Sequence, residues 1–160
     1  MTPTADEGLD AGGMKLAIVV SRFNDFVTRE LLRGAEACLD HHGGASGDRE
    51  LFHVPGAWEV SLASNRLAAT GRYDAIIALG ALIRGETPHF DFLAAETARG
   101  LGQAGIDAAI PVIFGVLTTD NVEQARARSG SKSGNKGWEA ALAAIEMVVL
   151  YRRIGKPVGT

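Results

Sequence analysis

Apolar positions along this chain follow two periods, one typical of buried strands and one typical of amphipathic helices. Short β-branched or continuously apolar runs fall at residues 15–21, 50–55, 74–83 and 110–118. Elsewhere apolar residues recur every three or four positions, which indicates helices at residues 25–42, 57–70, 88–102, 121–128 and 135–153. Strands and helices therefore alternate along most of the chain.

The first, third and fourth strands are continuously apolar, which predicts burial on both faces by crossover helices. We expect a three-layer α/β/α sandwich, flavodoxin-like, around a four-stranded and mainly parallel sheet. Residues 1–13 are rich in Gly, Thr and Asp and have no periodicity, so they are interpreted as a flexible N-terminal arm. Residues 14–160 are then a single domain.

Composition argues against several classes of function. A net charge of −3, without clustered Lys and Arg, makes nucleic acid a poor partner. The N-terminus lacks the features of a secretory signal, and no apolar run approaches the ~20 residues that cross a bilayer. We therefore expect a cytoplasmic protein with no membrane partner.

The cysteine and histidine residues do not suggest a metal site. Cys38 is the only cysteine and falls on the apolar side of its helix, where we expect a buried structural thiol. None of the four histidines has metal-ligand spacing, and His41 and His42 are interpreted as solvated residues at a helix end. These residues therefore predict no metal site.

Ligands of an open α/β sheet bind beyond the carboxyl ends of its strands. This rule selects four segments: Phe23-Asn24, residues 56–59 (GAWE), residues 84–89 (RGETPH) and Phe114 to Thr119. Two glycine-rich segments are excluded. Residues 100–105 (GLGQAG) match a dinucleotide motif, but they precede a strand and are interpreted as a helix end and loop; residues 130–137 (GSKSGNKG) lack P-loop spacing.

The RGETPH segment predicts the start of a helix. Thr87 is a good N-cap and Pro88 suits the first helical position, so His89 would lie in the first turn. Free N–H groups there can bind an anion such as phosphate, and the same field favours a neutral imidazole that can accept a proton. Position alone leaves His89 open as an ordinary surface residue, and leaves Arg84 open as a structural ion-pair partner of Glu86 or of another helix.

The aromatic and basic candidates also have two interpretations each. Trp58 could stack on a planar heterocycle while Glu59 binds hydroxyl groups, or Trp58 could belong to the core. The same choice applies to Phe23 and to Phe114. The basic candidates are Arg128 and Lys136. Each of them could bind a ligand or could be a solvated or ion-paired residue.

Taken together, these segments resemble the lumazine synthase family. The matching motifs are SRFND (21–25), VPGAWE (54–59), ALIRGETPHFDF (81–92), PVIFGVLTT (111–119) and QARARSGSKSGNKG (124–137). The resemblance covers about residues 14 to 152. It implies an enzyme that joins 5-amino-6-(D-ribitylamino)uracil to 3,4-dihydroxy-2-butanone 4-phosphate, without a metal or an organic cofactor. The product is 6,7-dimethyl-8-ribityllumazine, the precursor of riboflavin.

The resemblance also implies a role for each matching residue. The residues implied to bind ribitylaminouracil are Phe23, Ala57, Trp58, Glu59, Ala81, Leu82, Ile83, Phe114 and Lys136. Phe23 and Trp58 would flank the ring and Glu59 would hold the ribityl hydroxyls. The residues implied to bind the phosphate are Glu86, Thr87 and Arg128. His89 is implied to be the catalytic residue that moves protons.

Further implications concern assembly. In the family's pentameric ring, Phe114, Arg128 and Lys136 would reach the site from a neighbouring subunit, and the N-terminal arm would extend a neighbour's sheet. The short SGSKSGN link (129–135) resembles that of members whose pentamers form an icosahedral shell, and riboflavin synthase is an implied partner.

Two rival functions use the same fold. A non-catalytic lumazine- or flavin-binding or shell protein would lack the phosphate and proton-transfer residues, but Thr87, His89 and Arg128 are present. A signalling receiver needs acidic residues after the first strand, where this chain has Ser21 to Asn24 instead.

Overall fold

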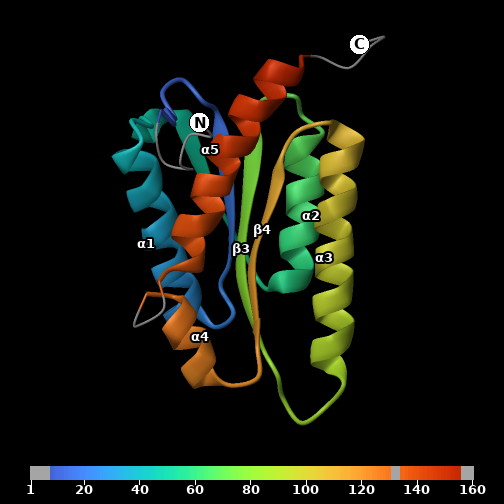
Figure 1. Ribbon diagram of the computed structural model, residues 1–160. Coiled ribbons are helices and arrows are strands. Elements are labelled where there is room, and N and C mark those ends of the chain that lie inside the picture. Colours follow the sequence, from blue (N-terminus) through green and yellow to red (C-terminus); the bar gives the residue numbers. More distant parts are fainter. Residues whose placement is uncertain (1–7, 131–133, 156–160) are drawn as a thin grey trace.

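The computed structural model describes residues 8–130 and 134–155 (Figure 1). The elements in chain order are β1 (Leu16–Ser21), α1 (Asp25–His41), the 3₁₀ helix η1 (Ser46–Asp48), β2 (Arg49–Val54), α2 (Ala57–Ala68), β3 (Ala75–Ile83), α3 (His89–Ala108), β4 (Val112–Thr119), α4 (Val122–Arg128) and α5 (Lys136–Ile154). Every strand and helix expected from the sequence is present. The largest difference in bounds is at the end of α3.

The strand order is β2-β1-β3-β4, and each neighbouring pair is parallel. Helices α1, α4 and α5 lie on one face of the sheet, and α2 and α3 lie on the other (Figure 1). A helix in each connection returns the chain to the starting end of the sheet, which is why the strands run in one direction. This confirms the three-layer, flavodoxin-like fold, with a sheet that is entirely parallel.

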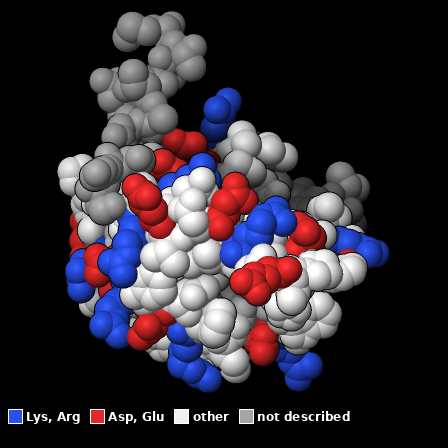
Figure 2. All heavy atoms as spheres, turned by 90° about the horizontal axis from the view of Figure 1, so that it is seen from below, with Lys and Arg blue, Asp and Glu red and all other residues white. Residues whose placement is uncertain are grey.

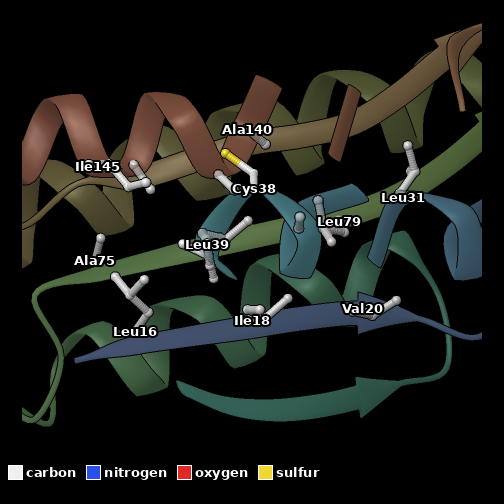
Figure 3. Packing of buried hydrophobic residues seen from close by; sticks show 14 of the residues in the cluster. Leu16, Ile18, Val20, Leu31, Cys38, Leu39, Ala75, Leu79, Ala140 and Ile145 are labelled. Atoms are coloured by element: carbon white, nitrogen blue, oxygen red, sulfur yellow. The ribbon is translucent and has the colours of Figure 1, made fainter. Parts of the chain in front are cut away.

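The core has one part on each face of the sheet, because successive side chains of a strand point in opposite directions. Leu16 and Ile18 pack under α1 and α5, whereas Ala17 and Val19 pack under α2 and α3. All of β1 is buried. Cys38 lies in the first part of the core, near Ala140 and Ile145 of α5 (Figure 3), so the prediction of a buried thiol is confirmed.

Helix α3 continues through residues 100–105, so the expectation that GLGQAG forms a helix end and loop is wrong. A Cβ at Gly100 would lie 3.0 Å from the Cβ of Ser61 in α2. This glycine therefore allows α2 and α3 to approach closely and does not end the helix. The helix ends at Ala108, before Ala109 adopts a left-handed φ of 55°.

Strand β4 is an edge of the sheet, which corrects the expectation that residues 110–118 are buried on both faces. Gly115 to Leu117 are buried, but Phe114 has 39% of its surface exposed. An edge strand has a neighbour on one side only, and a run of apolar letters cannot distinguish it from a central strand.

The pair His41 and His42 was expected to be solvated, and for His42 this is wrong. His42 is buried, and its Nδ1 lies 2.8 Å from the carbonyl oxygen of Cys38 one helical turn earlier. His41 is exposed. The amide of Ala11 and the ring of Trp138, whose centroid is 6.3 Å from that of His42, lie against the second histidine.

The N-terminal residues that the structure describes lie against the domain. Ala11 is buried, and its amide donates a hydrogen bond of 2.8 Å to the carbonyl of His42. Leu9 packs against the core under α1. Residues 1–7 of the expected arm lie outside the described residues. Contact with the domain therefore begins before residue 14.

Two further properties concern residues 8–130 and 134–155 alone. None of their helices is long and apolar enough to cross a membrane. Nor do they bring together three or more His, Cys, Asp or Glu side chains in a group able to hold a metal ion.

Candidate active site

The carboxyl ends of all four strands lie at one edge of the sheet, at Ser21, Val54, Ile83 and Thr119. Loops at this edge are joined by direct bonds. The amide of Phe23 donates to the carbonyl of Pro55 over 3.0 Å, and the side chain of Asn24 donates to the carbonyl of Ala81 over 2.9 Å. The segment after β1 is thereby held against both the start of α2 and the end of β3.

Two aromatic side chains at this edge are exposed, so their interpretation as core residues is wrong. Phe23 has 69% of its surface exposed and Trp58 has 49%. Glu59 follows in the first turn of α2 and is half-buried. Exposed rings of this size are costly to hydrate, and a planar ligand stacked on either of them would remove apolar surface from water.

Backbone groups are also available beside these rings. Strand β3 pairs with β1 only as far as Leu79, but it pairs with β4 as far as Ile83. The last residues of β3 therefore extend past β1 with one edge unpaired by a strand, and Asn24 uses one carbonyl of that edge. Helix α2 starts at Ala57 without a side-chain cap, which leaves N–H groups of its first turn available.

The turn from Gly85 to Pro88 leads into α3 and is exposed. Pro88, not Thr87, is the residue that precedes the helix, and no side chain caps it, so the prediction of a Thr87 cap is wrong. The carbonyl of Pro88 accepts the amides of Asp91 (3.1 Å) and Phe92 (3.4 Å). His89 is the first helical residue, in the first turn as expected. The uncapped start leaves its N–H groups for an anion.

Glu86, Thr87 and His89 present exposed polar groups at this turn. Within residues 8–130 and 134–155, their side chains make no hydrogen bond and no ion pair. Polar groups that are held at the end of a sheet without protein partners are available to a ligand.

Arg84 is a structural ion-pair residue, and its partners are not Glu86. Its Nε donates to Asp120 over 3.2 Å, and its Nη1 donates to Asp91 over 3.2 and 3.4 Å. The guanidinium also lies 4.5 Å from the centre of the Phe90 ring. The hydrogen bond to Asp120, and after it the charge of Asp91, raises the pKa of Arg84 above its ordinary value.

The remaining predicted residues form a separate group beside β4. A concavity of about 380 Å³ is lined by Phe114, Val116, Leu117, Thr118, Arg128, Lys136 and Glu139. Phe114 pairs with Ala78 in mid-sheet, five residues before the end of β4 at Thr119, so the expectation that it lies at the carboxyl edge is wrong. At 3.3 Å per residue it lies roughly 16 Å from that end.

Asn135 holds the two basic residues of this concavity in place. Its Oδ1 accepts the amides of Gly137 (2.8 Å) and Trp138 (3.1 Å), which caps the helix that begins with Lys136. Its Nδ2 donates to the carbonyl of Ser129 (3.3 Å), the residue after Arg128, and to the carbonyl of Glu30 in α1 (2.9 Å). One amide therefore connects α1, α4 and α5.

Charge at the carboxyl end of the molecule is mixed. Figure 2 views this end and shows basic and acidic side chains around a central area of uncharged residues. A surface of this kind suits a neutral heterocycle with a separate, local seat for an anion. It does not resemble the single-sign field that nucleic acid requires.

Sequence reasoning placed Asn24 in a candidate segment without assigning it a role, and it did not identify Asn135 as a contributor to the site. Asn24 adopts a left-handed φ of 62°, which is uncommon outside glycine and favours Asn. Asn135 stands directly before a helical pattern, a position that suggests a cap. Neither signal reveals the bonds to distant carbonyls that give these residues their effect on the site.

Comparison with known proteins is consistent with this arrangement. A sequence profile of the family described as 6,7-dimethyl-8-ribityllumazine synthase matches residues 13–152. A protein of that name from Prosthecochloris aestuarii is 54% identical over 155 residues, which cover 96% of this chain and 100% of the relative. Another, from Chlorobium chlorochromatii, is 53% identical over 146 residues, or 91% of this chain and 94% of the relative.

Proposed function

The chain belongs to the 6,7-dimethyl-8-ribityllumazine synthase family and is a transferase of riboflavin biosynthesis, and we propose that a neighbouring copy of the chain completes its active site. It condenses 5-amino-6-(D-ribitylamino)uracil with 3,4-dihydroxy-2-butanone 4-phosphate. The products are 6,7-dimethyl-8-ribityllumazine, phosphate and water. A non-catalytic binding or shell protein is not favoured, because the relatives are named as synthases.

The separation of the site residues into two groups supports a shared site. Aromatic rings, backbone groups and His89 belong to the carboxyl edge, whereas Phe114, Arg128 and Lys136 lie around the concavity beside β4. The first group offers recognition of a ring but little positive charge. The second offers two cations. A head-to-tail contact between copies would join the two groups at every interface of a closed ring.

The pyrimidine partner is assigned to the first group. Phe23 and Trp58 would lie on the two faces of the ring, and Glu59 would accept hydrogen bonds from the ribityl hydroxyls. The backbone of Ala57, with that of Ala81, Leu82 and Ile83, would bind the polar edge of the ring. Phe114 and Lys136 of the neighbouring copy would close the other side. Exclusion of water there strengthens each polar contact.

The phosphate is assigned to the start of α3, with Arg128 of the neighbouring copy. The N–H groups of an uncapped helix start and a guanidinium both stabilise negative charge. Thr87 can add a hydroxyl donor. Glu86 would contribute through its backbone N–H, since its carboxylate would repel the phosphate. These groups would also stabilise the charge that develops as the phosphate leaves.

His89 is assigned to proton transfer. Imine formation between the amine and the ketone, elimination of phosphate, and closure of the second ring each require a proton to move. We call the proposed phosphate site at the start of α3 the phosphate seat. An imidazole beside it can accept a proton from carbon or nitrogen and deliver it to a departing oxygen. Positioning of the two substrates supplies much of the remaining acceleration.

His89→Ala should therefore lower kcat without abolishing turnover. We expect a decrease of roughly a hundredfold or more, because general acid–base catalysis is lost while the substrates are still held together. Steady-state kinetics followed by lumazine fluorescence measure this decrease. His41→Ala, at the opposite end of the molecule, is the control and should leave kcat unchanged. An unchanged kcat in His89→Ala would remove His89 from the reaction.

We also propose a pentamer in the cytoplasm that can build an icosahedral shell and associate with riboflavin synthase. Large apolar side chains exposed on α3 support assembly: Phe92 has 70% of its surface exposed and Ile106 has 76%. The proposal of a shell is based on the shortness of the link at residues 129–135. Residues 131–133 of this link lie outside the described residues. Sedimentation velocity distinguishes a pentamer from a shell.

Mixing two inactive variants tests whether the site is shared. Glu59→Ala damages the first group and Lys136→Ala damages the second. In a co-refolded 1:1 mixture, about one quarter of the sites should combine two undamaged partners, because each interface draws one group from each copy. Product formation should recover accordingly. If all site residues came from one copy, every site would carry a defect and the mixture would be no more active than its components.

A further inference from the structure

Arg84 joins four elements at the edge of the sheet where the phosphate seat lies. Its amide donates to the carbonyl of Thr119 over 2.8 Å, which extends the pairing of β3 with β4 by one residue. Its guanidinium reaches Asp120, which precedes α4, and Asp91, in the first turn of α3. The end of β3, the end of β4 and the starts of α3 and α4 therefore meet at one side chain.

The turn after Arg84 has few bonds of its own. In the described part of the chain, the side chains of Glu86, Thr87 and His89 have no hydrogen-bond or ion-pair partner, and α3 begins without a side-chain cap. The Arg84–Asp91 pair and the guanidinium over the Phe90 ring are the polar and cation–π contacts that connect the start of α3 to the end of β3, while Phe90 and Leu93 also pack against the core on this face of the sheet. Phe90 is the residue directly after His89.

Arg84 is poorly suited to bind the phosphate itself. Two of its three guanidinium nitrogens already donate to carboxylates, and one face of the planar guanidinium lies over the Phe90 ring. Its Nη2 makes no hydrogen bond within the described residues, but a phosphate that drew the guanidinium away would leave the carboxylates of Asp91 and Asp120 unpaired beside the anion.

We propose that Arg84 is a positioning residue for the phosphate half of the site, acting through Asp91 and Asp120. It holds the first turn of α3, with His89 and the free N–H groups, at a constant place relative to the ends of β3 and β4. This inference rests on the proposed function, since it assigns a consequence to the phosphate seat at α3. A shift of about an ångström in that seat is enough to slow a reaction strongly.

Arg84→Gln should raise the KM for the phosphate substrate and lower kcat, each by roughly tenfold. The KM for ribitylaminouracil should remain within roughly twofold of the wild type, because the Arg84 side chain bonds to Asp91 and Asp120 and not to Phe23 or Trp58, and the backbone bond of residue 84 to Thr119 is retained in the variant. Arg84→Lys, which retains one donor and the charge, should recover part of the loss.

Arg72→Gln is the matched control. Arg72 also pairs with a carboxylate, that of Glu50 at 2.7 Å, and lies over a ring, that of Tyr73 at 5.2 Å, but it stands before β3 at the opposite end of the sheet. Its loss should affect the thermal midpoint about as much as the loss of Arg84 and should leave both KM values unchanged. If the two variants had the same kinetics, Arg84 would be only a structural residue.

A double-variant cycle with Asp91→Asn decides between positioning and direct binding. If Arg84 acts through Asp91, the single variant Asp91→Asn should raise the phosphate KM, and the double variant should be no worse than Arg84→Gln alone. If Arg84 binds the phosphate directly, Asp91→Asn would release it and lower that KM, which would overturn the inference. Normal wild-type activity in the same assay separates this outcome from a failure of the proposed function.

Discussion

Alanine at position 137 should destabilise the protein by at least about 3 kcal/mol, the upper end of what overpacking costs. A Cβ on Gly137 would lie 1.8 Å from the carbonyl oxygen of Leu31, inside the backbone of α1. No side chain can move aside to relieve this contact, so α5 must shift away from α1. The shift opens the core between the two helices and displaces Lys136. Thermal and denaturant unfolding measure the loss.

Gly102→Ala is the control for this prediction, because Gly102 lies inside α3 and a Cβ there would meet nothing within 4 Å. Alanine should stabilise a helix interior by up to about 1 kcal/mol relative to glycine. The two glycine-to-alanine changes should therefore have opposite signs. A thermal midpoint for Gly137→Ala equal to that of the wild type would show that α1 and α5 are not packed as closely as the structure has them.

Arg128→Ala should raise the KM for the phosphate substrate more than any change at His89 does. A hydrogen bond from a charged donor to a phosphate contributes about 1.5–3 kcal/mol, which corresponds to roughly tenfold to a hundredfold in KM. The side chain is exposed beside the concavity and makes no ion pair within the described residues, so its removal should not disturb the fold. Steady-state kinetics at saturating ribitylaminouracil isolate the effect.

Arg126→Ala provides the comparison on the same helix. Arg126 is also exposed, but its guanidinium lies 5.0 Å from the centre of the Phe26 ring and does not line the concavity. Its loss should leave the phosphate KM unchanged. Equal phosphate KM values for the Arg128 and Arg126 variants would remove Arg128 from the phosphate site and with it one cation of the proposed shared site.

The strands and helices could be predicted because their signals are local. A short, continuously apolar run such as the one within residues 74–83 is typical of a buried strand, and strand ends identify where a ligand can bind. The segments after β1, β2 and β3 that we propose to form the site are predicted in this way. The errors at residues 100–105 and at His42 have one origin: the environment of a residue depends on what packs over it, and no local pattern contains that information.

Contacts between distant segments cannot be predicted from a local pattern either. Asn135 bonds to the carbonyl of a residue 105 positions earlier, and Arg84 bonds to a carboxylate 36 positions later. Both residues have unremarkable neighbours in sequence, and Arg84 had no assignable role until its partners were known. Similarly, only the register of β3 with β4 shows that Phe114 lies away from the carboxyl edge.

Sequence was therefore sufficient for the α/β class, the order of elements, the family resemblance and the kinds of side chain that the chemistry requires. Only the tertiary structure separates those side chains into a carboxyl-edge group and a group beside β4. It also reveals the bonds of Asn135 next to Arg128 and Lys136, and the bonds of Arg84 to the starts of α3 and α4. The physical reason is that backbone preferences act between neighbours in the chain, whereas a site is assembled by burial of apolar surface between segments that are far apart in it.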